Sequence, residues 1–555
     1  MLNTSSIPMA VIPPTLNASA VHSAVDSLHT CGQLFFDGFL EQLGWMFYLI
    51  SPNKSAYASP HDVPNYEVQI MPIFTMMLAF EQIIRFFQRK RASRVSDIVI
   101  NLGAGLLFVA MRVLLLGTVL NIFYFFYDNY RIVDLPPTCI STWFLSLLLI
   151  EFCYYWVHRS LHEINIFWAS HQFHHNAVDI DVSTTLRDTL IDLVIYEFFP
   201  TPLALIIPPP ILLVHMQFSL IYQVWLHTEV VTHLGPIEYI INTPRQHRVH
   251  HGKNRYCIDK NYGALIMIWD RVFGTYQAEE EKIAFGTTAE AYPTYDTTTL
   301  HFYYYYDTVW KKFKQMDNWS DKMKALFYGP GWAPGKPRTG LLTDIPVVDP
   351  YAPLERYDPF IPFWQIYYCM FHGFLVALGF YVVTDHPLIR FSHLNAVMVF
   401  LYVLFALTSF GTIFDRRSMA PLVEVSRCLL YFLFDTYVIS SWMDSSLEPR
   451  LRNVTEMGLT FIRVVHFVSI VLWLMVWLSR TNRHCKETYD KLSLMKEDKY
   501  IDNYTIEQSK QDSWRFSRRL CYMSGAFGSF IILFLVFALR FEECTQFLNP
   551  TKIEL

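Results

Sequence analysis

Charged side chains are scarce in this sequence. Asp, Glu, Lys and Arg make up 17% of its 555 residues, whereas soluble proteins usually contain about 25%. The formal net charge of -5 is small for a chain of this length, so the composition gives no indication of a nucleic-acid partner. Hydrophobic residues reach 52% and aromatic residues 17%, which argues against a soluble protein and favours a membrane protein.

Paired cysteines, a signal peptide and a haem-binding segment are also missing. The nine cysteines form no CxxC pair and several lie in apolar runs, which favours buried free thiols over a disulfide framework. The first twenty residues lack the basic start and compact apolar core of a signal peptide. We therefore expect the first apolar membrane segment to direct targeting. No HPGG-type segment is present, which disfavours a fused cytochrome domain.

Long apolar runs are abundant, and they predict membrane helices, which need roughly 20 mostly apolar residues. The stretch 190–227 is apolar but has several prolines between 200 and 210, so it is either two spans or a re-entrant hairpin. Residues 31–50 include Asp37 and Glu41 and fit an interfacial amphipathic helix better than a span. The expected spans are 68–88, 97–126, 139–157, 361–383, 394–413, 423–443, 458–478 and 521–541.

Basic residues orient these spans, since the cytosolic loops of membrane proteins carry an excess of Lys and Arg. A basic cluster between Arg85 and Arg94 follows the first span and places that end in the cytosol. The stretch 127–138 is then lumenal, whereas 158–189 and 228–360 are cytosolic. The predicted fold is an all-α, polytopic helical membrane protein whose cytosolic helical cap holds a histidine-rich di-metal site.

We expect four regions along the chain. They are a lumenal N-terminal segment with the interfacial helix (1–65), a membrane core that carries the histidines (66–280), a cytosolic connecting segment (281–360) and the C-terminal membrane spans (361–555).

Eight histidines fall into three groups, HxxxH, HxxHH and HxxHH, whose spacing is that of metal ligands. The groups are His158 and His162, then His171, His174 and His175, then His247, His250 and His251. Residues three and four apart lie on one face of a helix, so each group can offer two or three imidazoles to one point. Eight imidazoles exceed the need of one tetrahedral zinc ion and fit a dinuclear site. Imidazole binds iron, zinc, copper and nickel, so the spacing leaves the metal open.

The other histidines and the nearby carboxylates are weighed separately. His227 ends the proline-rich stretch on the side of the three groups and is expected to supply a ninth ligand, whereas His233 is not. Isolated histidines on apolar faces are expected to be core residues, namely His215, His372 and His466. Ligand histidines usually donate their free ring N–H to a carboxylate or carbonyl. The acidic candidates for that role are Glu151, Glu163, Asp188, Asp259 and Asp270.

At the three histidine groups the chain resembles the fatty acid hydroxylase superfamily of membrane di-iron oxygenases, whose three motifs are met residue by residue. The flanking segments are similar as well, namely 155–159, 260–263 and 269–275. Within this superfamily the chain most resembles the alkylglycerol monooxygenases. This likeness is carried by 162–165 with 168–172, by TPRQHRVHHGKNRYCIDKNYG at 243–263 and by GPGWAPGKPRTG at 329–340.

The resemblance implies an enzyme of the endoplasmic reticulum membrane in which two iron ions occupy the histidine site. Such enzymes use tetrahydrobiopterin and O2 to hydroxylate the ether-bearing carbon of an alkylglycerol, and the hemiacetal collapses to a fatty aldehyde and a glycerol derivative. The resemblance assigns Glu163 a catalytic and pterin-related role. After His175 the chain departs from the family, because Val178 in the stretch 176–181 stands where a carboxylate is usual.

Two other functions are open on the sequence. The first is a related di-iron sterol or fatty acyl hydroxylase that receives electrons from a separate cytochrome. The second is a non-redox metal-binding membrane transporter, which the broken helix near 200–210 would suit. Clustering of the histidines at one face of the membrane, instead of along a path, disfavours the transporter. The expected partners are the alkylglycerol substrate and membrane lipids, and the oligomeric state is open.

Overall fold

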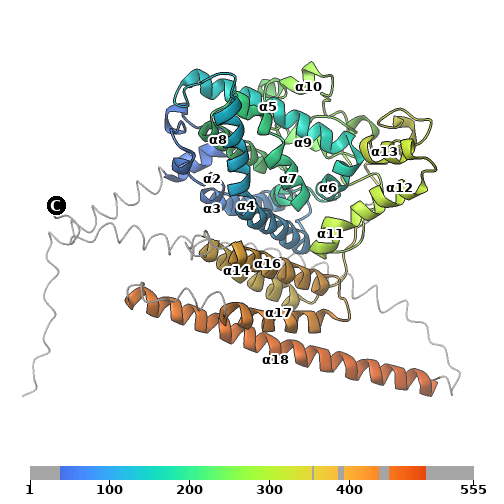
Figure 1. The fold of residues 1–555 in the computed structure, drawn as a ribbon. Helices are drawn as coiled ribbons and strands as arrows, with labels where there is room; N and C mark the ends of the chain where they lie inside the picture. Colours follow the sequence, from blue (N-terminus) through green and yellow to red (C-terminus); the bar gives the residue numbers. More distant parts are fainter. Residues whose placement is uncertain (1–37, 353–355, 385–392, 437–448, 495–555) are drawn as a thin grey trace, which may run out of the picture.

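The computed structural model describes residues 38–352, 356–384, 393–436 and 449–494 (Figure 1). Within these residues the regular structure is helical, apart from isolated β-bridges between Ile241 and Ile266 and between Gly252 and Phe285. The all-α prediction is therefore confirmed.

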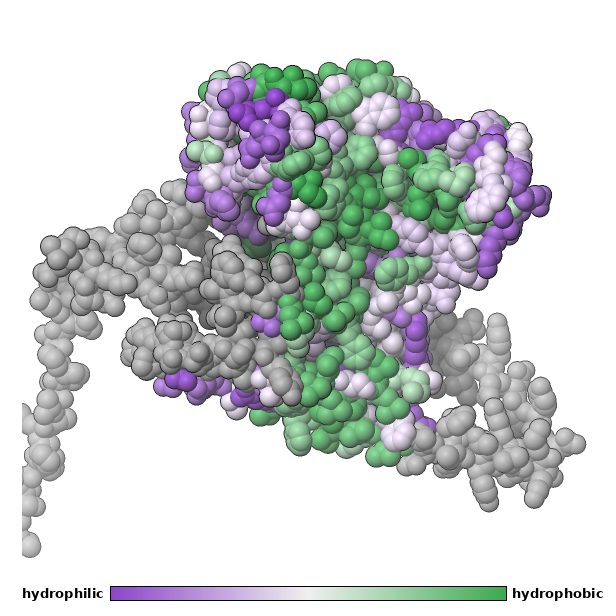
Figure 2. All heavy atoms as spheres, in the orientation of Figure 1, coloured by the Kyte–Doolittle hydropathy of each residue, from purple (hydrophilic) through white to green (hydrophobic). Residues whose placement is uncertain are grey.

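Six helices of the described residues are long and apolar enough to cross a membrane. They are Pro60–Phe87, Val95–Leu115, Ile140–Glu163, Phe363–Phe380, Leu394–Phe414 and Thr455–Arg480. Each overlaps an expected span, whereas the expected span 521–541 lies outside the described residues. Hydrophobic side chains cover a broad band from the upper part of the molecule to the lower bundle (Figure 2). The protein is therefore a multi-pass membrane protein.

The first half of the chain builds the upper part of Figure 1. Its helices are α2 (Tyr66–Gln69), α3 (Met71–Phe87), α4 (Val95–Tyr130), α5 (Ile140–Glu163), α6 (Asn165–His175), α7 (Leu190–Phe198), α8 (Pro209–Gln223) and α9 (Pro244–His250). Residues 38–45 are also helical, inside the segment expected to lie at the interface. Helix α5 runs without a break from its apolar start through His158 and His162.

The proline-rich stretch folds as a broken hairpin. Helix α7 has 9 residues and α8 has 15, and both are shorter than the roughly 20 residues that a span needs. Helix α8 begins with Pro209 in its first turn, where the missing N–H of proline costs no hydrogen bond. Its side chains meet α5, since Tyr154 Oη donates to Gln223 Oε1 at 2.7 Å. These lengths favour the hairpin alternative over two full spans.

The rest of the chain contributes α10, the connecting segment and the lower bundle. Its helices are α10 (Ile268–Val272), α11 (Thr297–Tyr304), α12 (Lys311–Gln315), α13 (Trp319–Phe327), α14 (Phe363–Thr384), α16 (His393–Phe414), α17 (Ala420–Phe434) and α18 (Pro449–Leu494). A π-helix, η8 (Tyr305–Trp310), joins α11 to α12. The expected span 423–443 is described only as far as residue 436, within α17 and two π-helical residues that follow it.

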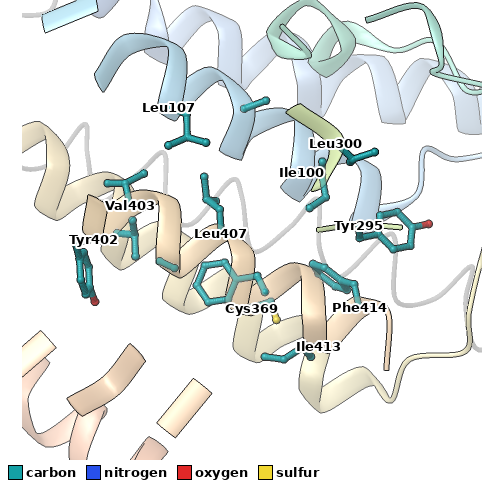
Figure 3. Close-up of a cluster of buried hydrophobic side chains, with 14 of the residues drawn as sticks. Ile100, Leu107, Tyr295, Leu300, Cys369, Tyr402, Val403, Leu407, Ile413 and Phe414 are labelled. Carbon is teal, nitrogen blue, oxygen red and sulfur yellow. The ribbon is translucent and has the colours of Figure 1, made fainter. Parts of the chain in front are cut away.

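A shared apolar core joins the lower bundle to α4. Figure 3 shows Ile100 and Leu107 of α4 on one side and Val403 and Leu407 of α16 on the other. Gly103 permits this approach, because a Cβ atom at this position would lie 2.5 Å from Leu407 Cδ2. The histidine-bearing half and the C-terminal helices thus pack as neighbours along one buried surface.

The isolated histidines are core residues, as predicted. His215 is bracketed by Tyr48 Oη at 2.7 Å and by the carbonyl of Trp143 at 3.0 Å. In the lower bundle, Arg427 Nη2 donates to His372 Nδ1 at 2.9 Å, and Nη1 lies 3.3 Å from His466 Nε2. A guanidinium can only donate, so the ring nitrogens that face it act as acceptors for a cation and are unsuited to a metal.

Candidate metal centre

Nine buried histidines gather into two adjoining sets. The five-histidine group contains His158, His162, His171, His175 and His250. The four-histidine group contains His174, His227, His247 and His251. Within each group, one ring nitrogen from every member lies within 4.8 Å of the others. No member is more than 6% exposed.

The helical spacing explains how the three motifs divide between the groups. Histidines four residues apart stay together, as His171 and His175 do in α6 and His247 and His251 do at the end of α9. In each HxxHH motif, the histidine three residues after the first one belongs to the other group. His174 of α6 therefore joins the four-histidine group, and His250 of α9 joins the five-histidine group. Each motif thus offers two imidazoles to one point, and each HxxHH motif gives its remaining histidine to the other group.

Ring nitrogens converge closely in the four-histidine group. His227 Nε2 lies 2.8 Å from His247 Nε2 and 3.2 Å from His174 Nε2. His251 Nε2 lies 3.1 Å from the Nε2 atoms of His174 and His247. Four nitrogens that bind one tetrahedral ion at about 2.1 Å are separated by roughly 3.4 Å. The arrangement is therefore close to that of a ligand set.

Backbone carbonyls fix which nitrogen of three rings carries the proton. The Nδ1 atoms of His158 and His250 lie 2.9 Å from the carbonyl oxygens of Tyr262 and Lys260, and His227 Nδ1 lies 3.1 Å from that of Gln223. A carbonyl can only accept, so each Nδ1 must donate. Each Nε2 then offers a lone pair to its group, which is the form that binds a metal.

Unpartnered nitrogens show that these residues fit metal ions. Buried polar atoms almost always have a hydrogen-bond partner, yet the Nε2 atoms of His162, His175 and His250 are buried and have none. Burial lowers the pKa of His171 to about 3, and it also lowers the pKa of His175, His247 and His251. These four rings are therefore neutral at physiological pH and free to act as ligands.

Carboxylates lie behind several of these rings. Asp188 Oδ1 is 3.3 Å from His174 Nδ1, and Asp259 Oδ1 is 3.8 Å from His162 Nδ1. These two acidic candidates thus lie where a carboxylate can orient a ligand ring. A further carboxylate, which the sequence did not single out, is Asp192, and its Oδ2 lies 3.9 Å from His171 Nδ1. Its place in α7, four residues after Asp188, is the only signal the sequence held.

Comparison with known proteins relates this centre to a family. The sequence model of the fatty acid hydroxylase family matches residues 143–275, and that of the alkylglycerol monooxygenase C-terminal domain matches 365–449. The chain is 38% identical to the alkylglycerol monooxygenase of Xenopus tropicalis, over 74% of this chain and 90% of that protein. It is 36% identical to that of Homo sapiens, over 70% and 86%, and 31% identical to that of Caenorhabditis elegans, over 82% and 92%. The chain belongs to the alkylglycerol monooxygenase family.

Membership in the alkylglycerol monooxygenase family makes the protein a membrane monooxygenase. The two histidine groups lie in the part matched by the fatty acid hydroxylase family. No solved structure matches the chain.

In this alkylglycerol monooxygenase family member, Glu163 lies at the end of α5 and outside both histidine groups. Arg159 Nε donates to Glu163 Oε1 at 2.7 Å, and Arg338 Nη1 donates to Oε2 at 2.8 Å. Arg338 belongs to the segment 329–340 that carries part of the family likeness. The ion pair between Arg338 and Glu163 holds that segment beside the start of α6, where the backbone N–H of Asn165 also donates to the carbonyl of Tyr328.

His233 and the acidic residues of the stretch 176–181 lie outside the metal centre. His233 is 58% exposed at its side chain and pairs with Glu238 at 2.9 Å. In the departing stretch 176–181, Asp179 pairs with Arg94 at 3.2 Å, and the Asp181 carboxylate caps the 3-10 helix that follows it. The acidic side chains of this stretch thus hold the fold together and do not join either histidine group.

Proposed function

We propose that the protein is a tetrahydrobiopterin-dependent monooxygenase that hydroxylates the ether-linked carbon of alkylglycerol lipids with O2. The product is a hemiacetal that breaks down to a fatty aldehyde and a glycerol derivative. Relatives that carry the name alkylglycerol monooxygenase over most of their length support this reaction. The observation that carries the proposal is the pair of buried histidine groups.

The proposed cofactors are two iron ions, one in each histidine group. The five-histidine group and the four-histidine group would supply all nine protein ligands, and each is made of neutral imidazoles alone. Bound there, iron supplies redox chemistry for a C–H bond that acids and bases cannot activate. The protein's own part is to orient the rings through backbone carbonyls and to exclude water from nine side chains that are at most 6% exposed.

The aromatic residues beside the five-histidine group fit a lipid substrate. The ring of Tyr154 lies 5.4 Å from that of His158 and stacks on Tyr196 at 5.8 Å. Both tyrosines come from helices of the membrane core, α5 and α7. In the proposed arrangement the alkyl chain lies among the membrane helices on this side, and the polar glycerol end faces the histidine groups.

The proposed location is the endoplasmic reticulum membrane, with the histidine groups on the cytosolic side. The basic residues that follow the first span support this orientation. The division into the regions 1–65, 66–280, 281–360 and 361–555 belongs to the same proposal. The two family matches lie inside the second and fourth of these regions.

An assay on membranes tests the reaction directly. Membranes that contain the protein receive labelled alkylglycerol, O2 and tetrahydrobiopterin, and fatty aldehyde is measured. We expect aldehyde with the wild-type chain and none with His174→Ala, because the His174 Nε2 atom lies between His227 and His251 at 3.2 and 3.1 Å. His233→Ala is the matched control, since its exposed ring lies outside both groups. It should retain full activity.

The same assay separates the proposal from its nearest competitor. Aldehyde formed with NADPH and a reductase, but not with the pterin, would assign the enzyme to the cytochrome-dependent hydroxylases instead. Full activity of His174→Ala would remove the second motif from the ligand set.

A further inference from the structure

A short loop after α9 holds two histidines of one metal group. The loop runs from residue 259 to 263, and its carbonyl oxygens at Lys260 and Tyr262 accept the Nδ1–H groups of His250 and His158, each at 2.9 Å. Both histidines belong to the five-histidine group. The ring orientation in that group therefore depends on where the backbone of this loop lies.

A buried carboxylate outside the loop sets that backbone in place. Asp270 is fully buried in α10, and its two oxygens accept the backbone N–H groups of Tyr262 and Gly263, both at 2.8 Å. Thr275 Oγ1 donates a third hydrogen bond to Asp270 at 2.7 Å. The fit is close, because a Cβ atom at Gly263 would lie 3.0 Å from Asp270 Oδ2.

The four-histidine group is oriented from another part of the fold. His227 Nδ1 lies 3.1 Å from the carbonyl of Gln223, the last residue of α8. His174 faces Asp188, which lies just before α7. The two groups thus have different hydrogen-bond acceptors, and the carbonyls of the loop that Asp270 holds accept only from histidines of the five-histidine group.

We infer that Asp270 is a positioning residue that governs metal binding in the five-histidine group and not in the four-histidine group. It acts through the loop 259–263 and touches no metal ligand itself. The inference rests on the proposed di-metal function, and it adds that the two metal positions can be lost separately.

Glu151 offers a matched control. This carboxylate of α5 is 1% exposed and accepts the backbone N–H groups of Leu265 and Ile266 at 2.8 and 3.0 Å. Glu151 therefore holds the backbone just after the two residues that Asp270 holds. The carbonyl of Leu265 accepts the backbone N–H of Asn242 and not a histidine. Glu151→Gln therefore perturbs a similar pair of hydrogen bonds to the backbone, but this backbone accepts no hydrogen bond from a histidine.

The experiment compares the iron content of three purified full-length proteins: wild type, Asp270→Asn and Glu151→Gln. We expect two iron ions per chain in wild type and in Glu151→Gln. In Asp270→Asn, the amide N–H group faces a backbone N–H donor, so the two repel and the loop 259–263 shifts. We expect the five-histidine group to lose its ion, so that about one ion per chain is retained. Loss of an outer support usually weakens metal affinity about 10- to 100-fold, and here the loss should affect one ion only. Mössbauer spectra of iron-57 protein should show two iron environments in wild type and one in Asp270→Asn.

The possible results separate this inference from the function on which it rests. Two ions in Asp270→Asn at wild-type affinity would overturn the inference alone, as would equal losses in Asp270→Asn and Glu151→Gln. Wild-type protein with fewer than two ions would overturn the di-metal function and the inference with it. If Asp270→Asn does not fold, Thr275→Val removes one hydrogen bond to the same carboxylate. It must weaken the same single ion for the inference to hold.

Discussion

At the scale of single residues, Glu163 joins two segments that are far apart in the sequence. Its carboxylate receives Arg159 from its own helix and Arg338 from the segment 329–340. The side chain of Glu163 is 14% exposed, so its two ion pairs are partly shielded from water. Charge-assisted hydrogen bonds of this kind are stronger than neutral ones. A carboxylate at this position thus fixes both the end of α5 and the neighbouring segment.

Replacing Glu163 by alanine should impair the response to tetrahydrobiopterin and leave the iron content unchanged. The carboxylate is outside both histidine groups, so the metal ligands stay in place. A hydrogen bond to a charged group contributes about 1.5–3 kcal/mol, so the apparent KM for the pterin should rise roughly tenfold or more. Iron analysis and pterin titrations of the purified protein measure the two effects.

Asp344→Ala provides the control for that experiment. Asp344 pairs with Lys336 at 2.8 Å in the same part of the chain, but the two side chains are 44% and 36% exposed. Exposed pairs contribute little, so this variant should match wild type. A pterin response of Glu163→Ala that equals wild type would remove the proposed role of Glu163.

At the scale of helices, α16 packs closely against the connecting segment at Gly411. A Cβ atom at Gly411 would lie 2.4 Å from the carbonyl oxygen of Tyr295 and 2.6 Å from the Cα atom of Asp296. These are backbone atoms, which cannot turn away as the tip of a side chain can. The adjoining contact between Thr298 Oγ1 and Thr408 Oγ1, at 2.6 Å, fastens the same two elements. The lower bundle and the segment before α11 therefore depend on this close approach.

Gly411→Ala should lower the free energy of unfolding by about 1–3 kcal/mol, the usual cost of forcing an extra group into a packed site. Gly373→Ala, in the neighbouring helix α14, is the matched control because its Cβ would meet nothing within 4 Å. Alanine is a better helix former than glycine by up to about 1 kcal/mol, so this variant should be at least as stable as wild type. Thermal unfolding of both variants in one detergent measures the difference. Equal stability of the two variants would contradict the packing described here.

The spacing of the histidines made the ligand candidates predictable, but not their division into two groups. Periodicity places His171, His174 and His175 on one face of a helix. Whether the middle one turns to the same ion or to the next depends on how α6 and α9 lie against each other. The carbonyls of Lys260 and Tyr262 were beyond prediction for a different reason, since every residue carries a carbonyl and only the fold selects two of them.

The membrane helices were predictable because their apolar runs are long, whereas the broken hairpin left two options. The lengths of α7 and α8, which are 9 and 15 residues, favour the hairpin. The partner of Glu163 was missed for a similar reason. Arg338 lies in a segment that the sequence had marked, but 175 residues separate the two side chains, and no local pattern links them.

At the scale of the whole molecule, the orientation of the helices in the membrane determines whether the histidine groups face the cytosol or the lumen. Cys139 is exposed, whereas the other cysteines of the described residues, Cys153, Cys257, Cys369 and Cys428, are buried. It directly precedes α5, at the opposite end of that helix from His158 and His162. The hydroxyl and the backbone N–H of Ser141 lower the pKa of the Cys139 thiol through hydrogen bonds. A thiol with a lowered pKa reacts more readily as its thiolate.

Cys139 should therefore report the lumenal side. In sealed microsomes from a chain in which Cys31, Cys485, Cys521 and Cys544 are serine, a membrane-impermeant maleimide should label Cys139 only after the membrane is opened. Ser320→Cys, at an exposed position of α13, should react while the vesicles are still closed, because it lies in the segment expected to be cytosolic. Cys139→Ser sets the background. The reverse pattern, with Cys139 labelled first, would place the histidine groups on the lumenal side and contradict the orientation derived from the basic residues.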